Sequence, residues 1–398
     1  MSSRKSMTSK SALAGVRVLD FTSMIAGPYA GRLLADAGAE VVKIEPPEGE
    51  DMRSRQPQRD GHSLFFGQLN TGKKSVALDL KNKGGVAIVK RLVEKADVVL
   101  ENFRPGVMTR LGLDYAALSG INPRLIYCAI SGYGQTGPNR DKPAYAPIVH
   151  AASGYDRALM RYAADRTQPA ASAIFVADLM GGIYAMSGIQ TALLARAQTG
   201  RGQMVDVALM DCMQNLLLYE IAAAQLPPLP PRLTYGPITA ADGDVIVAPI
   251  TQRNFHALAE AIGRPELRSD ERFARIATRS RHWRELMGEI ETWTRTRRVA
   301  ECLRVLEAAG VPCSHFGEPE DALTDAHTRE RGLLKPVRDG AGEFLGVNPP
   351  YRLSDTPVEL HSPVPATGEH TDTLLAAWLG LDAPGLQQAR AEGAFGRA

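Results

Sequence analysis

Apolar residues in the first third of the chain gather in short runs that alternate with stretches of helical periodicity. The runs of strand length are residues 16–21, 39–45, 75–78, 97–100 and 125–130. Helical stretches lie between them, around residues 33–35 and over 85–94. Strand, helix and strand in this order predict βαβ units with parallel strands. The pattern therefore predicts a doubly wound α/β fold, in which ligands bind beyond the carboxyl ends of the strands.

The pattern changes at a stretch with four prolines in five positions, within residues 226–231. Proline forbids a regular helix and favours an extended linker. Beyond it, a strand over 242–248 and amphipathic helices over 254–262, 281–292 and 298–309 indicate a smaller α+β domain. A further helix is predicted over 371–379. We therefore expect four parts: a disordered tail (1–11), a large domain (12–225), the linker with the small domain (226–325), and a segment returning to the large domain (326–398).

The composition excludes several classes of protein. Of the 398 residues, 44% are hydrophobic, 23% charged and 6% aromatic, which is typical of a globular α/β enzyme. No run approaches the roughly 20 apolar residues of a membrane-spanning helix. The net charge is only +2, so no global field favours nucleic acid or an anionic membrane. We expect neither nucleic acid nor membrane among the partners.

The cysteines and the N-terminal residues indicate the cellular compartment in which the protein is expected. The four cysteines lie far apart, without Cys-x-x-Cys or zinc-finger spacing, which predicts a reducing cytoplasm and no metal. Residues 1–11 are rich in serine and carry three basic residues, but they lack the apolar core of a signal peptide. A mitochondrial presequence is the weaker alternative, because the segment is short and has no apolar face.

One carboxylate, Asp178, stands between an apolar run and two glycines at the start of a long apolar helix. It could cap the helix, since aspartate there accepts backbone N–H bonds and complements the helix dipole. It could also be a nucleophile. Gly181 and Gly182 favour a functional site, because each costs a helix about 1 kcal/mol relative to alanine. Close approach of a ligand, or of another backbone, would require them.

The loops after the predicted strands lack the usual nucleotide-binding glycines. Residues 22–28 stand where a dinucleotide fold would carry Gly-x-Gly-x-x-Gly, and Glu45 where it would carry a ribose-binding acid. Without those glycines a pyrophosphate cannot approach the helix, which disfavours a nicotinamide oxidoreductase. No P-loop motif is present either.

Separated cations follow the strands instead. Lys73, Arg104 and Arg110 lie on successive loops, where they could clamp a diphosphate and a ribose phosphate, with Phe103 against an adenine. Each of these cations taken alone would be an ordinary solvated charge. It is their placement on consecutive βα loops that indicates a binding site.

Several of these segments resemble the class III CoA-transferases, the family of formyl-CoA transferase, whose relatives include α-methylacyl-CoA racemase. The matching segments, spread from about Leu13 to Leu381, are residues 18–21, 26–28, 33–45, 69–75, 101–106, 177–178, 199–207 and 368–371. The resemblance implies a doubly wound large domain, a smaller domain, and a homodimer whose subunits interlock. It also implies an acyl-CoA and a small carboxylic acid as substrates, with no permanently bound cofactor.

The resemblance gives Asp178 a covalent role, through a mixed anhydride and an aspartyl-CoA thioester. It implies contacts to CoA from Ile25, Ala26, Asn70, Lys73, Asn102, Phe103, Arg104, Arg110, Lys142 and Tyr145. It implies contacts to the acyl substrate from His150, Gly181, Gly182 and Gln252. Three arginines that precede Asp178, at positions 157, 161 and 166, are expected to be surface charges.

Departures from the family pattern narrow the activity. A racemase needs a His and a Glu for proton transfer, but those positions hold Tyr145 and about Gln252, which are poor bases near pH 7. Formyl-CoA transferase carries a glycine-rich loop that has no counterpart between Tyr219 and Asp242, and Pro46 replaces its CoA-contacting arginine. We therefore predict transfer of CoA from an acyl-CoA, with succinyl-CoA the family's expected donor, to a small mono- or dicarboxylate. An acyl-CoA racemase and a non-catalytic CoA-binding protein remain alternatives.

Overall fold

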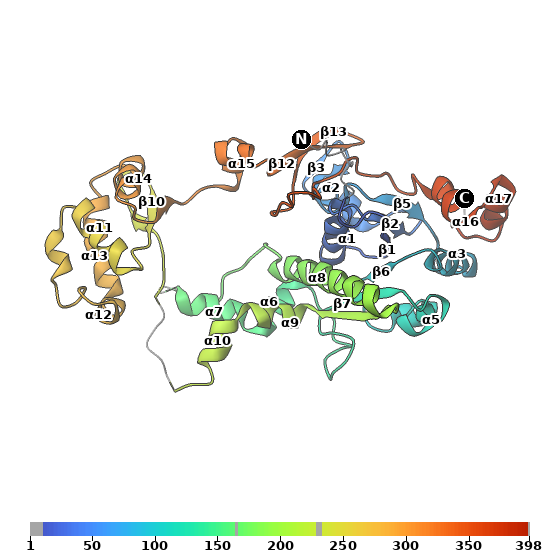
Figure 1. Cartoon of the computed structure of the whole chain (residues 1–398), viewed down its shortest axis with the longest axis horizontal. Helices are drawn as coiled ribbons and strands as arrows, with labels where there is room; N and C mark the ends of the chain where they lie inside the picture. Colours follow the sequence, from blue (N-terminus) through green and yellow to red (C-terminus); the bar gives the residue numbers. More distant parts are fainter. Residues whose placement is uncertain (1–10, 164–165, 228–232, 397–398) are drawn as a thin grey trace, which may run out of the picture. The chain divides into compact units, whose positions relative to one another are not determined.

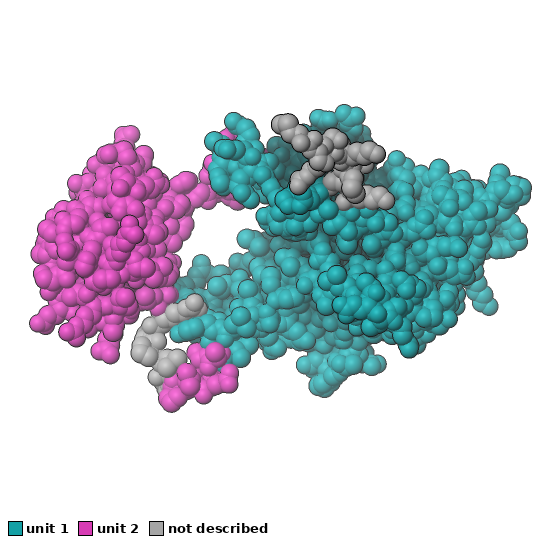
Figure 2. Space-filling view, in the orientation of Figure 1, with its two compact units in different colours: residues 1–221, 326–398 teal, residues 222–325 magenta. Residues whose placement is uncertain are grey.

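Two compact units make up the chain. The structure is a computed structural model that describes residues 11–163, 166–227 and 233–396. Unit 1 comprises Met1–Ile221 with Ala326–Ala398, and unit 2, Ala222–Asp325, is inserted between them (Figure 2). The expected tail lies almost entirely outside the described residues, as do four of the linker positions, 228–231.

A six-stranded parallel sheet forms the centre of unit 1, in the order β5-β2-β1-β6-β7-β8. Its strands are β1 (Arg17–Asp20), β2 (Glu40–Glu45), β5 (Lys74–Ala77), β6 (Val98–Glu101), β7 (Ile126–Ser131) and β8 (Met204–Ala208). The α/β fold with a parallel sheet is thus confirmed. The chain builds outward from β1 to β5 and then returns to β6, so the strand order reverses between β1 and β6.

Helices cover both faces of this sheet (Figure 1). One face carries α1 (Ala26–Asp36), α6 (Ala146–Ser153), α8 (Val176–Thr199) and α9 (Leu209–Leu216). The other carries α3 (Lys83–Val93), α5 (Tyr115–Ile121), α16 (Thr371–Leu379) and α17 (Ala383–Ala391). Neighbouring strand residues point to opposite faces, so Val18 joins the first core and Leu19 the second.

Shorter elements complete unit 1. They are η1 (Asp51–Ser54), β3 (Gln58–Arg59), β4 (His62–Ser63), α2 (Leu64–Asn70), α4 (Val107–Leu111), α7 (Tyr155–Tyr162), α10 (Leu218–Ala223, which runs into unit 2), α15 (Ala326–Glu330), β12 (Leu334–Asp339) and β13 (Gly342–Val347). Strands β12 and β13 form an antiparallel hairpin.

Unit 2 has a core of its own, in which Phe255, Phe273 and Leu286 are fully buried. A three-stranded antiparallel sheet is made by β9 (Ile238–Thr239), β10 (Asp244–Val247) and β11 (Cys313–His315). The helical elements are α11 (Gln252–Ala261), η2 (Pro265–Arg268), α12 (Ile276–Arg281), α13 (Trp283–Thr294), α14 (Val299–Ala308) and η3 (Pro319–Leu323). The helix expected from residue 281 begins later, because Arg281 ends α12 and His282 interrupts the helical backbone.

The segment that precedes α16 covers the free edge of β5. The backbone N–H of His370 donates to the Ser75 carbonyl at 2.9 Å, and that of Gly368 donates to Ser75 Oγ at 2.8 Å. The N–H of Ala77 donates to Thr371 Oγ1 at 3.0 Å. The Gly-Glu-His-Thr motif therefore attaches the return segment to the sheet. Among the described helices of the whole chain, none has the length and apolarity to cross a membrane.

Candidate active site

A cavity of about 700 Å³ opens at the carboxyl ends of β1, β6 and β7. Residues 23–26 line it after β1, residues 102–104 after β6, and residues 130–132 where β7 ends. The starts of α6 and α8 complete the wall with Tyr145 and Asp178. The cavity thus occupies the point where the strand order reverses, the usual ligand site of open α/β sheets.

Asp178 reaches this cavity from the first turn of α8. It does not cap the helix, since the capping position is Phe175 and no side chain accepts a bond there. Burial raises the pKa of Asp178 to about 6, because a carboxylate removed from water loses hydration. At pH 7 the group is therefore mostly ionised yet poorly solvated, a state that suits a nucleophile.

His150 holds the start of α8 in place. Its ring lies on α6 and is only 3% exposed, and its Nε2 accepts a 3.0 Å hydrogen bond from the backbone N–H of Ala177. Burial lowers the pKa of His150, which keeps Nε2 free to accept. His150, for which the family resemblance implies a substrate contact, is not among the residues that line the cavity. The structure places it behind Asp178, where it fixes the adjoining peptide.

Gly181 and Gly182 serve packing between helices and do not line the cavity. A Cβ on Gly182 would lie 2.8 Å from the Ala26 carbonyl oxygen and 2.9 Å from Tyr29 Cδ1, both on α1. A Cβ on Gly181 would lie 2.4 Å from Leu209 Cδ2. Backbone and side chains of neighbouring helices, rather than a ligand, therefore occupy the space that these glycines leave.

Asn102 joins two of the loops that form the cavity. Its Oδ1 accepts from the N–H of Ser23 at 2.9 Å, and its Nδ2 donates to the Ser23 carbonyl at 2.7 Å. The next residue, Met24, has φ of 66° and lines the cavity. A left-handed conformation is uncommon for a residue with a side chain and marks a locally constrained backbone. Asn102 is thus committed to shaping the loop expected to bind CoA.

Lys73 and Asn70, both expected to contact CoA, lie inside the protein. Lys73 Nζ donates to Asp20 Oδ2 at 2.8 Å, to the Pro28 carbonyl at 2.9 Å and to Asn70 Oδ1 at 2.9 Å. Burial lowers the pKa of Lys73 to about 8. Burial alone would raise the pKa of Asp20, but Lys73 and Lys43 hold it below its usual value. The three partners of Lys73 leave it as a structural cation beneath the β1 loop.

The other expected contacts fall into two groups. Ile25, Ala26, Phe103, Arg104 and Tyr145 line the cavity. Those that do not line it are Arg110, Lys142 and Gln252. Gln252 belongs to unit 2, where its side chain bonds to the Ala274 carbonyl at 3.0 Å and to Arg279 at 3.2 Å.

The cavity-lining residues that the sequence interpretation did not single out include Met24, Arg55, Gln56, Phe65 and Phe175. Phe175 and Phe65 pack on a small apolar cluster formed by Ile25, Met52, Phe66 and Leu69. Phe175 had a partial indication in the sequence, because it lies three residues before Asp178. No sequence pattern marked the others, because η1 and the following loop have no regular periodicity.

Comparison with known proteins agrees with this geometry. The family model for CoA-transferase family III matches residues 13–371. The chain belongs to CoA-transferase family III. It is 36% identical to the succinate–glutarate CoA-transferase of Agrobacterium fabrum over 385 residues, which are 92% of this chain and 96% of that protein. It is also 36% identical to the succinyl-CoA–D-citramalate CoA-transferase of Chloroflexus aurantiacus, covering 93% and 94% of the two chains.

Solved structures resemble this family III CoA-transferase over nearly its whole length. A CAIB/BAIF family protein from Brucella suis superposes with a TM-score of 0.79 and 34% identity, covering 93% of this chain and all of that one. The Mycobacterium tuberculosis protein Rv3272 gives a TM-score of 0.82 and 31% identity, over 91% and 99% of the two chains. The expected family and its transferase class are thereby confirmed.

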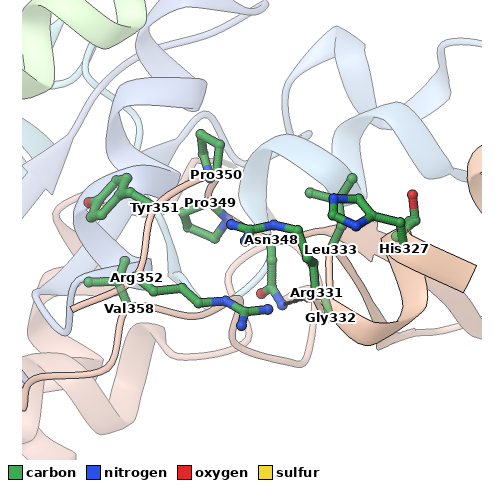
Figure 3. A pocket seen from close by; sticks show the side chains of 11 residues that line it. His327, Arg331, Gly332, Leu333, Asn348, Pro349, Pro350, Tyr351, Arg352 and Val358 are labelled. Atoms are coloured by element: carbon green, nitrogen blue, oxygen red, sulfur yellow. Dashed lines mark hydrogen bonds between the residues drawn. The ribbon is translucent and has the colours of Figure 1, made fainter. Parts of the chain in front are cut away.

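A second cavity of this family III member, of about 260 Å³, lies beside the β12–β13 hairpin (Figure 3). Arg331 and Arg352 extend into it from opposite sides, and His327 lies at its edge. Asn348 supports its wall by donating to the Gly332 carbonyl at 2.7 Å. Among the described residues that line this cavity there is neither a carboxylate nor a thiol, so they offer no nucleophile comparable to Asp178.

Proposed function

We propose that the protein is a CoA-transferase that uses Asp178 as a covalent nucleophile. A buried, mostly ionised carboxylate at the strand-reversal cavity carries this proposal. Membership of family III and the activities in the names of its relatives, which act on succinate, glutarate and D-citramalate, support it. The donor would be an acyl-CoA such as succinyl-CoA, and the acceptor a small carboxylic acid.

The reaction follows from successive exchange at the carbonyl carbons of the donor, of the Asp178 side chain and of the acceptor. The Asp178 carboxylate attacks the thioester carbon of the donor, the C–S bond breaks, and CoA leaves as a thiolate with a mixed anhydride on Asp178. The thiolate attacks the Asp178 side-chain carbon, which releases the donor acid and forms an aspartyl-CoA thioester. The acceptor carboxylate repeats both steps in reverse. Each intermediate keeps one carbonyl carbon activated, as an anhydride or as a thioester, so one difficult step becomes several easier ones.

The described residues of the cavity include groups suited to binding CoA but not the pair of acid–base groups that racemisation needs. Arg104 could pair with phosphate, and Phe103 and Tyr145 offer aromatic surface near it. Across the described lining residues there is no His, Glu or Lys. Asp178 is therefore the one described lining carboxylate that could remove an α-proton near pH 7, and a racemase needs a second base on the other face of the α-carbon, which favours the transferase. The mechanism above needs no such base.

A homodimer is part of the proposal. Helix α8 exposes Leu179 (38%), Ile183 (46%), Tyr184 (38%) and Leu194 (69%). An apolar strip of this length on one helix is typical of a surface that is covered in the assembled protein. We propose that a second copy covers it in the interlocked manner expected for the family, and that the enzyme works in the cytoplasm.

Covalent labelling tests the role of Asp178. Incubation with succinyl-CoA and other acyl-CoA donors, followed by peptide mass spectrometry, should reveal a CoA adduct on the peptide that contains Asp178. The Asp178→Asn variant should carry no adduct and should lose CoA transfer by at least about 1,000-fold, since the nucleophile is gone. If a broad donor panel never labels this peptide in the wild-type protein, the covalent mechanism is wrong.

A measurement of stability against pH would show whether the Asp178→Asn variant is folded. Because the pKa of Asp178 is raised to about 6, the folded state holds this proton more tightly than the unfolded state. The carboxylate therefore destabilises the fold progressively as pH rises from about 4 to 6. Above pH 6, Asp178→Asn should melt at a higher temperature than the wild type. Its free energy of unfolding should exceed that of the wild type by up to about 3 kcal/mol. The difference should vanish near pH 4.

A further inference from the structure

Two groups of polar residues line the cavity. In the first, hydrogen bonds between Asn102 and Ser23 join the loops after β1 and β6, and Arg104 lines the wall. The second is Arg55 with Gln56, which directly follow η1.

Asp178 shares this cavity with both groups. Phe175, three residues before it, packs on the apolar cluster that includes Met52 of η1 and Ile25. This cluster therefore joins the segment before Asp178 to η1, which leads directly into Arg55.

Arg55 is free to bind a substrate. Two residues earlier, Arg53 donates from Nε and Nη2 to both oxygens of Glu45, at 2.8 and 2.7 Å, and is committed to the fold. Arg55, by contrast, is exposed and forms no ion pair with any carboxylate in the described part of the chain. Arg55 and Arg104 are the two basic side chains among the described lining residues. One cation is therefore left over once Arg104 is assigned to a CoA phosphate.

The surroundings of Arg55 suit a substrate with two carboxylates. A guanidinium binds a carboxylate with two parallel hydrogen bonds. Met52, Phe65 and Phe175 add apolar surface to the same cavity, which suits a short methylene chain. A dicarboxylic acid held with one carboxyl group at Asp178 would direct the other towards this cation.

We propose that Arg55 selects dicarboxylic substrates by binding the carboxylate remote from the reacting one. This inference rests on the proposed function of Asp178. It names a specificity residue that the sequence interpretation did not single out.

Two donors of equal chain length test the inference. Succinyl-CoA and butyryl-CoA share CoA and four acyl carbons, but only the first has a free carboxylate. The measurement is the rate constant for CoA adduct formation on Asp178, which requires no acceptor. Arg55→Met should lower the rate constant for succinyl-CoA by about 10- to 100-fold more than that for butyryl-CoA. Arg55→Lys keeps the positive charge but cannot form two parallel hydrogen bonds to a carboxylate. Its rate constant for succinyl-CoA should lie between those of wild type and Arg55→Met.

Matched variants separate the competing explanations. Arg104→Met should slow both donors by similar factors, because the CoA portion is common to them. Arg352→Met, in the second cavity, should slow neither. The inference is overturned if Arg55→Met slows both donors equally, which would place Arg55 on CoA, or if it changes neither rate. If the wild-type protein forms no adduct with either donor, the proposed function itself fails and the inference falls with it.

Discussion

His150 connects the acidity of the solution to the position of Asp178 through one hydrogen bond. Its Nε2 can accept from the Ala177 N–H only while it is unprotonated. Burial lowers the pKa of His150, so the unfolded state binds this proton first. The stability that the neutral ring contributes is present above about pH 6.5 and is lost as the pH falls towards the lower folded pKa. His150 is thus a positioning residue with a pH signature.

Two replacements of His150 separate the effect of its hydrogen bond to Ala177 from the effect of its size. In His150→Gln the amide oxygen can still accept from the Ala177 N–H, so we expect activity within about 3-fold of wild type. Because the amide does not titrate, the variant should lose less stability than the wild type below pH 6.5. In His150→Leu the buried N–H is unpaired, at a cost of about 1–3 kcal/mol, and kcat should fall by about 10-fold. Thermal melting and CoA-transfer rates between pH 5 and 8 measure both effects. A leucine variant as active as the glutamine variant would contradict the positioning role.

At the scale of elements, the contact between α1 and α8 determines where Asp178 lies. The two helices approach so closely that Gly182 faces the Ala26 carbonyl oxygen. Ala26 begins α1 and also lines the cavity. The glycine pair therefore brings the start of α8, with its carboxylate, against the loop that follows β1.

Gly182→Ala tests this contact. The added Cβ would meet a backbone oxygen at 2.8 Å, which cannot rotate away, so we expect a loss of about 2 kcal/mol or more in the free energy of unfolding. Gly181→Ala should cost less, because its Cβ meets the mobile end of Leu209. Gly120→Ala, in α5 with no atom within 4 Å, is the matched control and should be neutral or slightly stabilising. Equal stability of the Gly182 and Gly120 variants in urea titration would show that the helices can separate freely.

Sequence periodicity predicted elements well and side-chain environments poorly. The runs that became β1, β2, β5, β6 and β7 were visible, because buried strands are nearly continuous in apolar residues. Edge strand β8 was missed, since its first three residues are partly exposed. The glycines could not be assigned, because a ligand and a neighbouring helix both require the absence of a Cβ. Lys73 could not be assigned either, since its partner Asp20 lies 53 residues away in the sequence.

For the whole molecule, association should depend on the exposed strip of α8. Ile183→Asp places a charge on that strip, and burying an unpaired charge at an interface is strongly unfavourable. We expect analytical ultracentrifugation to give twice the chain mass of 42.9 kDa for wild type and a shift towards the monomer for Ile183→Asp. Ile121→Asp, which changes an exposed residue of α5, should leave the dimer intact. A monomeric wild type, or an unaffected Ile183 variant, would refute the proposed assembly.

The covered edge of β5 bears on the order in which the molecule is made. Ser75 and its partner Gly368 are 293 positions apart, so the ribosome completes β5 long before the segment that protects it. At about 5–20 residues per second, the strand edge stays open for roughly 15–60 seconds. An open edge is a template for pairing with other chains. During that interval the segment that will cover the edge has not been made. We therefore expect a chaperone, or a low local concentration of other nascent chains, to limit aggregation.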